Sequence, residues 1–253
     1  MEGFKEIIFK ISGPVAVITL NRPHRLNALG KTLIDEAAAL TDIIPTMKDV
    51  KIIIITGAGK NFCSGLDVSE MADIDQDEGL RLIRAGAKVY ESIYRLRQIT
   101  IAAVEGYCLG GGFELALSCD ILVSSRNAFF GEPEVNFSVL PGIVRVWRHA
   151  GLNRARYMAL TGNIFAAREV AEWGLISKMT PSGKSLAEAK KIAQMLLEKP
   201  ETALMTVKRL FSEVMGMTYH EASEAERNAF LELYKTADRQ ERMRAFKRRK
   251  STR

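Results

Sequence analysis

The sequence predicts an α/β core followed by a helical C-terminal region. Short apolar runs rich in β-branched residues alternate with helical patterns through roughly the first 184 of the 253 residues, and this alternation is typical of α/β domains. The run VKIIIITG at 50–57 is continuously apolar, as expected for a strand buried on both faces of a sheet. Beyond residue 184 every pattern is helical. We therefore predict an α/β core over 1–184 and a helical region over 185–253.

The elements of the core are strands separated by glycine-containing turns and by helices. EIIFKI and VAVITL, on either side of Ser12-Gly13-Pro14, predict a hairpin. A helix is expected from about Thr32, and a longer one from about Glu78 to Leu96. The remaining core elements are a strand at 99–106, a glycine-led helix from about Gly111, a strand at 120–125 and a short strand at 129–130. Further helices are expected at 185–198, 201–215, 218–235 and 238–249.

The composition is that of an ordinary globular protein, with 47% hydrophobic and 26% charged residues. No apolar run approaches the length that a bilayer span requires, and the first residues lack the pattern of a secretion signal. Cys63, Cys108 and Cys119 are odd in number and form no CxxC pair. Free thiols suit a reducing compartment, so we expect a cytoplasmic protein that does not enter a membrane.

The net charge is +6, and much of it lies in the tail RQERMRAFKRRKSTR at 239–253. A solvated helix end is the simplest interpretation of such a run. Contact with a phosphorylated ligand is the next alternative and RNA binding is the last, so nucleic acid is not the expected partner.

Several common cofactor and catalytic motifs are incomplete. Gly57-Ala58-Gly59 follows a strand, but Phe62 occupies the place of the third glycine in a dinucleotide fingerprint. The triplets GKT and GKS lack the upstream glycine of a phosphate-binding loop. The histidines have no metal-ligand spacing, and no GxSxG motif surrounds Ser64. We therefore expect no metal site, nucleotide site or serine triad.

A strand–loop–helix unit with glycines in the loop occurs twice, at 52–68 and 103–115. Glycine has no Cβ, so the backbone of each loop can approach a ligand closely. In the second unit a helix begins at about Gly111, and the first N–H groups of a helix have no partner within it. Amides from the two loops can together bind an oxyanion. Close packing of a helix against a strand is the alternative explanation of the glycines at 110–112.

Two glutamates near these loops predict acid–base chemistry. Glu114 lies one helical turn beyond Gly111, and Glu134 follows a short strand in the loop FFGEPEVNF. Carboxyl groups in apolar surroundings have raised pKa values, and two that lie near one another lose their protons at different pH. Such a pair can supply a general acid and a general base. For the neighbouring Glu132 a surface position is expected.

Five collinear blocks, which together span essentially the whole chain, resemble the successive signatures of the crotonase, or enoyl-CoA hydratase, superfamily. They are NRPHRLNAL (21–29), GAGKNFCSGLDVSEM (57–71), AAVEGYCLGGGFELALSCDILVSS (102–125), FGEPEVNFSVLPG (130–142) and ALTGNIFAAREVAEWGLISKM (159–179). The resemblance implies a crotonase-like spiral of ββα repeats with a helical C-terminal trimerisation region, assembled as a homotrimer or as a hexamer of two trimers. It also implies an acyl-CoA thioester as ligand. Coenzyme A is then part of the substrate, and no separate cofactor is expected.

The same resemblance implies roles for individual residues. The oxyanion-hole amides of the family fall on Leu66 and Gly111. Its two glutamates fall on Glu114, which chiefly activates the water, and on Glu134, which delivers the α proton. Family members that keep both are typically hydratases, which add water syn across the 2,3 double bond of a 2-enoyl-CoA. Isomerisation or hydrolysis of an acyl-CoA is the alternative on this fold, and a non-catalytic homologue that binds RNA or CoA comes after it.

Further positions are implied to contact CoA or the acyl chain. Arg25 matches the place where the family often has Lys or Arg near the CoA phosphates, and a guanidinium can bind phosphate through two hydrogen bonds. Phe230 and Lys250, or Lys247 in its place, resemble the C-terminal elements that reach the CoA of a neighbouring subunit. The remaining expected CoA contacts are Leu26, Ser64, Leu66 and Asp67, and the expected substrate-pocket residues are Met71, Pro141, Gly142 and Trp147.

One segment departs from the family pattern. After Leu140-Pro141-Gly142 the family usually continues with the glycine-rich AGGTQRL, whereas this chain reads IVRVWRHAG at 143–151 and is about three residues shorter. Its bulky and polar side chains, among them Arg145 and Trp147, would remodel the acyl pocket and can admit a ring-bearing or otherwise unusual acyl group. A rearranged surface turn is the alternative.

Overall fold

The computed structural model describes residues 3–250 of the chain, with side chains as far as residue 248. The contacts between residues divide the chain into two units, Met1–Ala193 and Gln194–Arg253. The sequence-based boundary after residue 184 coincides with the start of helix α8 (Ser185–Leu197), which the contact-based division cuts near its C-terminal end.

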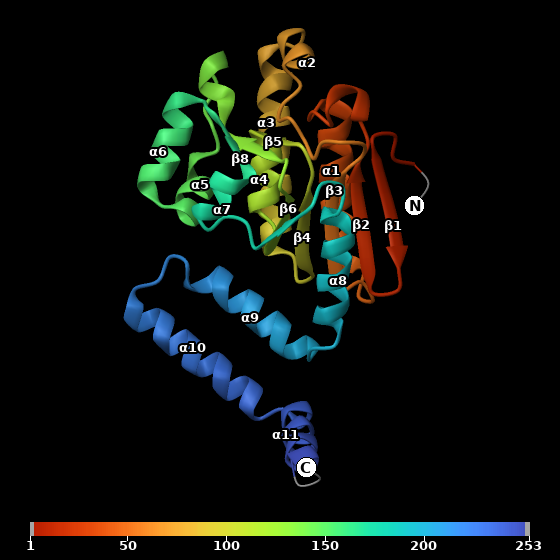
Figure 1. The fold of residues 1–253 in the computed structure, drawn as a ribbon, viewed down its shortest axis with the longest axis vertical. Helices are drawn as coiled ribbons and strands as arrows, with labels where there is room; N and C mark the ends of the chain where they lie inside the picture. Colours follow the sequence, from red (N-terminus) through yellow and green to blue (C-terminus); the bar gives the residue numbers. More distant parts are fainter. Residues whose placement is uncertain (1–2, 251–253) are drawn as a thin grey trace. The chain divides into compact units, whose positions relative to one another are not determined.

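The first unit is built around a six-stranded sheet in the order β1-β2-β3-β4-β6-β9 (Figure 1). The predicted hairpin is present, because β1 (Ile7–Ser12) and β2 (Val15–Leu20) pair antiparallel at the edge of the sheet. The strands that follow are all parallel to their neighbours: β3 (Ile52–Gly57), β4 (Ile99–Val104), β6 (Ile121–Ser125) and β9 (Lys178–Thr180). Ile53 and Ile54 on β3 point to opposite faces and are both fully buried. The prediction of a strand covered on both faces is therefore confirmed.

Two long helices cover one face of this sheet. The helices α1 (Lys31–Ile43) and α3 (Gln76–Arg95) pack against each other, and their leucines join Ile53 and Ile55 in one hydrophobic core. Helix α3 begins two residues before the predicted Glu78, because the Asp75 carboxylate accepts a hydrogen bond of 2.8 Å from the Glu78 amide and so caps the helix. The short 3-10 helices η1 (Pro23–Arg25) and η2 (Ile44–Thr46) precede and follow α1.

A second, three-stranded sheet lies next along the chain and leads into the glycine-led helix. Its strands are β5 (Tyr107–Leu109), β7 (Phe129–Gly131) and β8 (Ile164–Ala166), with β5 parallel and β8 antiparallel to β7. Helix α4 (Gly111–Leu117) follows β5 directly, and Phe113 on α4 packs on Phe130 of β7 with ring centroids 5.3 Å apart. The short helices of this region are α2 (Val68–Ala72), η3 (Pro133–Phe137), α5 (Ile143–Ala150), α6 (Leu152–Thr161) and α7 (Ala167–Glu172).

The helices of the second unit agree with the prediction to within a few residues. They are α9 (Glu201–Val214), α10 (Tyr219–Tyr234) and α11 (Ala237–Lys250). Helix α10 begins where Thr218 and Glu221 form a reciprocal capping box. Arg209 on α9 and Glu232 on α10 form an ion pair of 2.8 Å between the two packed helices. Within the described residues no helix is long and apolar enough to cross a membrane.

Ile54→Ala should destabilise the first unit strongly, because the Ile54 side chain is fully buried in the centre of the six-stranded sheet. Removing such a side chain typically lowers the free energy of unfolding by about 2–5 kcal/mol. Ile8→Ala is the matched control, since Ile8 lies on the edge strand β1 and is 37% exposed. Chemical denaturation followed by circular dichroism measures both. Equal losses in the two variants would contradict the assignment of β3 to the centre of the sheet.

Candidate active site

The two glycine-containing loops lie side by side beyond the carboxyl ends of β3 and β4. The Cys63 amide donates to the carbonyl of Tyr107, and the Leu109 amide donates to the carbonyl of Cys63, both at 2.9 Å. On the other side of the first loop, the Leu29 amide donates to the Gly65 carbonyl at 2.8 Å. These main-chain bonds fix the loop between the start of α1 and strand β5, so the positions of its other amides are set by the sheet.

The three consecutive glycines each have a separate steric reason. Gly110 has a φ of +49°, and a Cβ on it would collide with the Glu134 carboxylate. A Cβ on Gly111 would lie 2.5 Å from the Tyr90 hydroxyl oxygen, and one on Gly112 would lie 2.6 Å from Cβ of Cys63. Close packing therefore accounts for Gly112, whereas Gly110 and Gly111 make room for a carboxylate and a hydroxyl group.

The amides of Leu66 and Gly111 are among the main-chain donors beside these glycines that have no acceptor in the described residues. Leu66 lies in a single parallel bridge with Leu29, in which the flanking Gly65 carbonyl and Asp67 amide are the groups that bond. Gly111 is the first residue of α4. Across the described residues, neither the Leu66 nor the Gly111 amide donates a hydrogen bond to another main-chain group. The two loops thus present unpaired N–H donors close to the buried glutamates.

Glu114 is held by an arginine that the sequence did not assign to it. Arg145, on α5, places Nη1 2.6 Å from Glu114 Oε2 and donates from Nε to Ser118 Oγ at 3.2 Å. The Arg145 guanidinium also lies over the Tyr90 ring, 5.0 Å from its centroid. Burial raises the pKa of Glu114 above its ordinary value, and Arg145 opposes part of that rise. The alternative of a rearranged surface turn at 143–151 is therefore wrong, because the segment forms helix α5 and places the Arg145 guanidinium beside Glu114.

Glu134 lies in different surroundings, on η3 against the Gly110 loop. Its Oε2 atom is buried and accepts no hydrogen bond from a donor in the described residues. Burial raises the pKa of Glu134, and the nearby charge of Glu114 adds to the rise. Of the two glutamates, only Glu114 has a cation beside it, so the neutral form is favoured at Glu134.

The surface position expected for Glu132 is wrong, because its side chain is completely buried. Glu132 comes directly after β7 and before the turn of η3, and Pro133 between the two glutamates begins that turn. Its Oε2 accepts a hydrogen bond of 3.1 Å from the Gly142 amide. Gly142 in turn touches the Glu114 side chain, since a Cβ at this glycine would overlap it. Three carboxyl groups therefore lie in one cluster, which we call the carboxyl cluster: the completely buried Glu132 and the partly buried Glu114 and Glu134.

The residues expected to contact CoA are partly assembled around the first loop. The Ser64 amide donates to the Leu26 carbonyl at 3.2 Å, and Leu26 has a left-handed φ of +53°. Arg25 is exposed, and its Nη1 lies 3.4 Å from Ser69 Oγ. The Asp67 carboxylate, by contrast, caps α2 and pairs with the buried Arg22 at 3.1 Å. The Asp67 side chain therefore stabilises the fold around the loop.

The other expected contacts lie apart from this loop or outside the described atoms. Phe230 is on α10 in the second unit, stacked on Tyr234 with ring centroids 6.0 Å apart. The side chain of Lys250 lies outside the described residues. Of the expected pocket residues, Gly142 and the buried Pro141 border the carboxyl cluster. Met71 packs on the hydrophobic core from α2, and Trp147 on α5 is half exposed, so their place in an acyl pocket stays a prediction.

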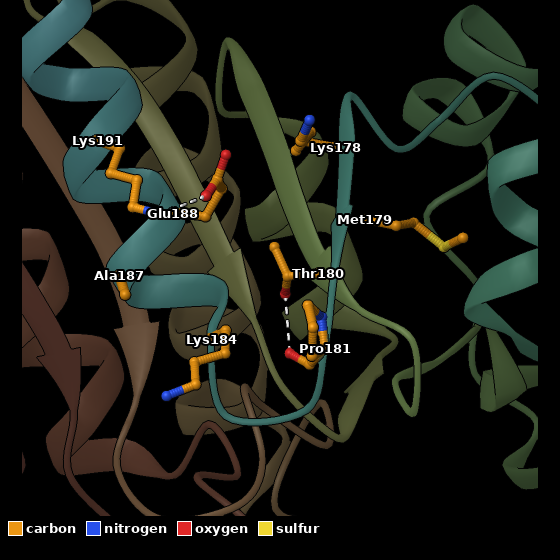
Figure 2. A pocket seen from close by; sticks show the side chains of 8 residues that line it. All are labelled: Lys178, Met179, Thr180, Pro181, Lys184, Ala187, Glu188 and Lys191. Atoms are coloured by element: carbon orange, nitrogen blue, oxygen red, sulfur yellow. Dashed lines mark hydrogen bonds and ion pairs between the residues drawn. The ribbon is translucent and has the colours of Figure 1, made fainter.

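A surface hollow of about 420 Å³ lies between β9 and the start of α8 (Figure 2). Figure 2 shows Thr180 and Pro181 on the strand side, and Ala187, Glu188 and Lys191 on the helix side. Lys191 pairs with Glu188 at 3.5 Å. None of the residues that line this hollow belongs to the carboxyl cluster or to the two glycine loops, so it is a separate feature of the surface.

The geometry around the carboxyl cluster can perform acid–base chemistry on a substrate that carries a carbonyl oxygen. Unpaired amides can stabilise negative charge that develops on such an oxygen. A carboxylate beside a cation can take a proton, and a buried carboxyl group without one can give a proton. Tyr90 was missed as a member of this site, and Arg145 was expected at the acyl pocket but not as the partner of Glu114, because neither belongs to a local motif and both reach the site from other helices.

The comparisons with known proteins all identify the same family. The family described as enoyl-CoA hydratase/isomerase matches residues 10–253. The short-chain-enoyl-CoA hydratase of Clostridium acetobutylicum is 35% identical over 244 residues, which cover 95% of this chain and 94% of that protein. The crotonyl-CoA hydratase of Syntrophomonas wolfei is 34% identical over 251 residues, covering 96% and 95%. The crystal structure of an enoyl-CoA hydratase from Bacillus anthracis matches at a TM-score of 0.91 and 29% identity, over 97% of each chain. The predicted crotonase-like fold is thereby confirmed.

Arg145→Met should raise the pKa of Glu114 further, because it removes the cation that opposes the effect of burial. Carboxyl chemical shifts in NMR spectra of protein labelled at glutamate carboxyl carbons, followed against pH, measure this directly. Arg148→Met is the matched control on the same helix, since no ion pair joins Arg148 to the carboxyl cluster in the part of the chain that the structure describes. An unchanged Glu114 titration in the Arg145 variant would rule out the ion pair in solution.

Proposed function

This chain belongs to the enoyl-CoA hydratase/isomerase family, and from this and the geometry of the site we propose that it adds water to the 2,3 double bond of a 2-enoyl-CoA thioester. The observation that carries the proposal is the contrast between the two predicted catalytic glutamates. Glu114 pairs with a cation, whereas Glu134 is buried without one. Such a contrast gives a base and an acid at the same pH.

The amides of Leu66 and Gly111 form the oxyanion hole of the proposed reaction. As the hydroxyl group adds to the β carbon, negative charge develops on the thioester oxygen, and an enolate-like species forms. The two amides have no other main-chain acceptor among the residues described, and the rigid bonds of both loops hold them in place before the substrate arrives. Each preorganised donor of this kind is typically worth a factor of about 10²–10³ in rate.

The two glutamates divide the proton transfers. The Glu114 carboxylate accepts a proton from water while the oxygen of that water bonds to the β carbon. Protonated Glu134 gives its proton to the α carbon, and the carbon–carbon double bond becomes single. One water has then been added in total, and the proton gained by Glu114 balances the one lost by Glu134. Exchange with solvent returns both groups to their starting states.

CoA is proposed to lie along the first loop, with its phosphates near Arg25. Arg25 is exposed on η1, and the structure records no ion pair for it within residues 3–248. Its guanidinium is therefore available to a phosphate group. The left-handed turn at Leu26 accepts a hydrogen bond from the Ser64 amide, two residues before Leu66, so the proposed phosphate contact and the oxyanion hole lie on two adjacent segments of backbone.

We also propose that the protein assembles as a homotrimer or as a hexamer of two trimers, and that it works in the cytoplasm. Large apolar side chains on α9 and α10, including Phe211 and Phe230, are exposed in the single chain. Burial between copies would remove this surface from water. The three free thiols, two of them buried, suit a reducing compartment.

Mixing the protein with crotonyl-CoA should abolish the ultraviolet absorbance of the conjugated thioester. Glu114→Gln and Glu134→Gln should each lower kcat by about 10²–10⁴, the range for loss of a general acid or base. Glu172→Gln is the control, because Glu172 is an exposed residue of α7 with a helical ion pair. Full activity in either site variant would refute its role.

The mass of the product separates hydration from the other reactions of this family. Hydration adds one water to the intact thioester, isomerisation leaves the mass unchanged, and hydrolysis releases free CoA. Absence of turnover across linear, branched and cyclic enoyl-CoAs, combined with tight RNA binding that weakens steeply with salt, would instead support a non-catalytic binding protein.

A further inference from the structure

Glu132 is a completely buried carboxyl group that the proposed reaction does not use. Its exposed fraction is 0%. Oε2 accepts the Gly142 amide at 3.1 Å, whereas Oε1 is buried and has no donor. The arginine of the site pairs with Glu114 instead, and no ion pair involving Glu132 is present in residues 3–248. An ionised carboxylate in this position would be largely unsolvated and unpaired, which is strongly unfavourable.

The neighbouring carboxyl group of Glu134 offers a hydrogen-bond partner for Oε1 of Glu132. Oε2 of Glu134 is also buried without a donor, and burial raises the pKa of both carboxyl groups. A hydrogen bond between the two side chains would satisfy both of these oxygen atoms. Two ionised carboxylates cannot form such a bond and repel each other. A proton on one of them satisfies the bare oxygen atoms of both.

We propose that Glu132 is a positioning residue, whose carboxyl group stays protonated and donates a hydrogen bond from Oε1 to Oε2 of Glu134. This inference rests on the hydration reaction proposed above. Glu132 is the member that keeps the proton, because it is completely buried. The proton lies on Oε1, since Oε2 already accepts a hydrogen bond from the Gly142 amide. A neutral carboxylic acid has one accepting and one donating oxygen, and this arrangement uses both.

The bond matters most after Glu134 has given its proton to the α carbon. Glu134 is then an ionised carboxylate in a buried position, and the O–H group of Glu132 stabilises its charge. Glu132 itself neither gains nor loses a proton in the cycle, so the transfers between water, Glu114, Glu134 and the substrate still balance. The effect of this bond on the pKa of Glu134 is to lower it, which offsets part of the effect of burial.

The other titratable groups around Glu132 and Glu134 do not change these protonation states. Burial raises the pKa values of Tyr90 on α3 and Cys108 on β5 well above their ordinary values, so both are neutral near pH 7. Glu114 on α4 and Arg145 on α5 are the charged groups that face the pair, and they bond to each other. Glu132 therefore has no competing cation or anion as its hydrogen-bond partner.

The test compares Glu132→Gln with Glu132→Met through the pH dependence of kcat/KM on crotonyl-CoA. Glutamine keeps an acceptor for Gly142 and a donor for Glu134, so it should keep kcat within about tenfold and leave the alkaline limb near its wild-type position. Methionine fills a similar volume without either group. It should lower kcat by about 10- to 100-fold, as for loss of a hydrogen bond to a charged group, and move the alkaline limb to higher pH, because the pKa of Glu134 rises.

The sign of the shift distinguishes the proposal from an ionised Glu132. If Glu132 carried a negative charge, both variants would remove a repulsion, and the pKa of Glu134 would fall in both. A shift of the alkaline limb to lower pH in both variants would therefore overturn the proposal, as would an identical profile for all three proteins. Thermal unfolding of each variant checks that it is folded.

Infrared spectroscopy tests the proton on Glu132 without any substrate. The wild-type protein at neutral pH should show one carbonyl stretch of a protonated carboxylic acid more than Glu132→Gln, in which the band of protonated Glu134 remains. Absence of this additional band from the wild type would overturn the proposal even if hydration is confirmed. Its presence in a protein that turns over no enoyl-CoA would instead place the failure in the proposed function.

Discussion

The cost of removing carboxyl groups from water is the constraint on which the site depends. The structure places three of them in one cluster, with Glu132 completely buried and Glu114 and Glu134 partly buried, and burial disfavours the charge on each. The neighbours then decide which group is ionised. Arg145 supports a charge on Glu114, and the amide of Gly142 alone does not compensate for one on Glu132. The three carboxyl groups therefore have different protonation states although they lie close together.

The backbone around the cluster explains why so little freedom remains in it. Main-chain bonds tie the Cys63–Leu66 loop to β5 and to Leu29, and Gly111 follows β5 directly, so the amides of Leu66 and Gly111 are both held by this framework. Gly110 and Gly142 lie directly against Glu134 and Glu114, and neither position has room for a Cβ. A side chain at either glycine would have to displace a carboxyl group. The packing and the proposed chemistry therefore both require glycine at these two positions.

Much of the fold was predictable because its signals are local. The run Ile52–Ile55, the hairpin and the long helices have periodicities that a short window of sequence contains, and the glycines and two glutamates belong to local motifs. Arg145 and Glu132 were not predictable in the same way. Arg145 meets Glu114 across 31 residues of chain, and the burial of Glu132 depends on how the loop before η3 folds over Gly142. Charged residues in a loop are usually exposed, so the general rule pointed to the surface.

The residues around Glu114 and Glu134 also determine which of the two accepts a proton and which one donates it. Two equivalent glutamates would not determine which of them takes a proton from the water at the β carbon and which gives a proton to the α carbon. Here helix α5, in the segment that departs from the family pattern, supplies the cation that keeps Glu114 a base. Glu132 supplies a neutral donor to the other glutamate and also holds Gly142, which packs on Glu114. One buried hydrogen bond thus links the acid to the base, and a change at Glu132 would act on both halves of the reaction.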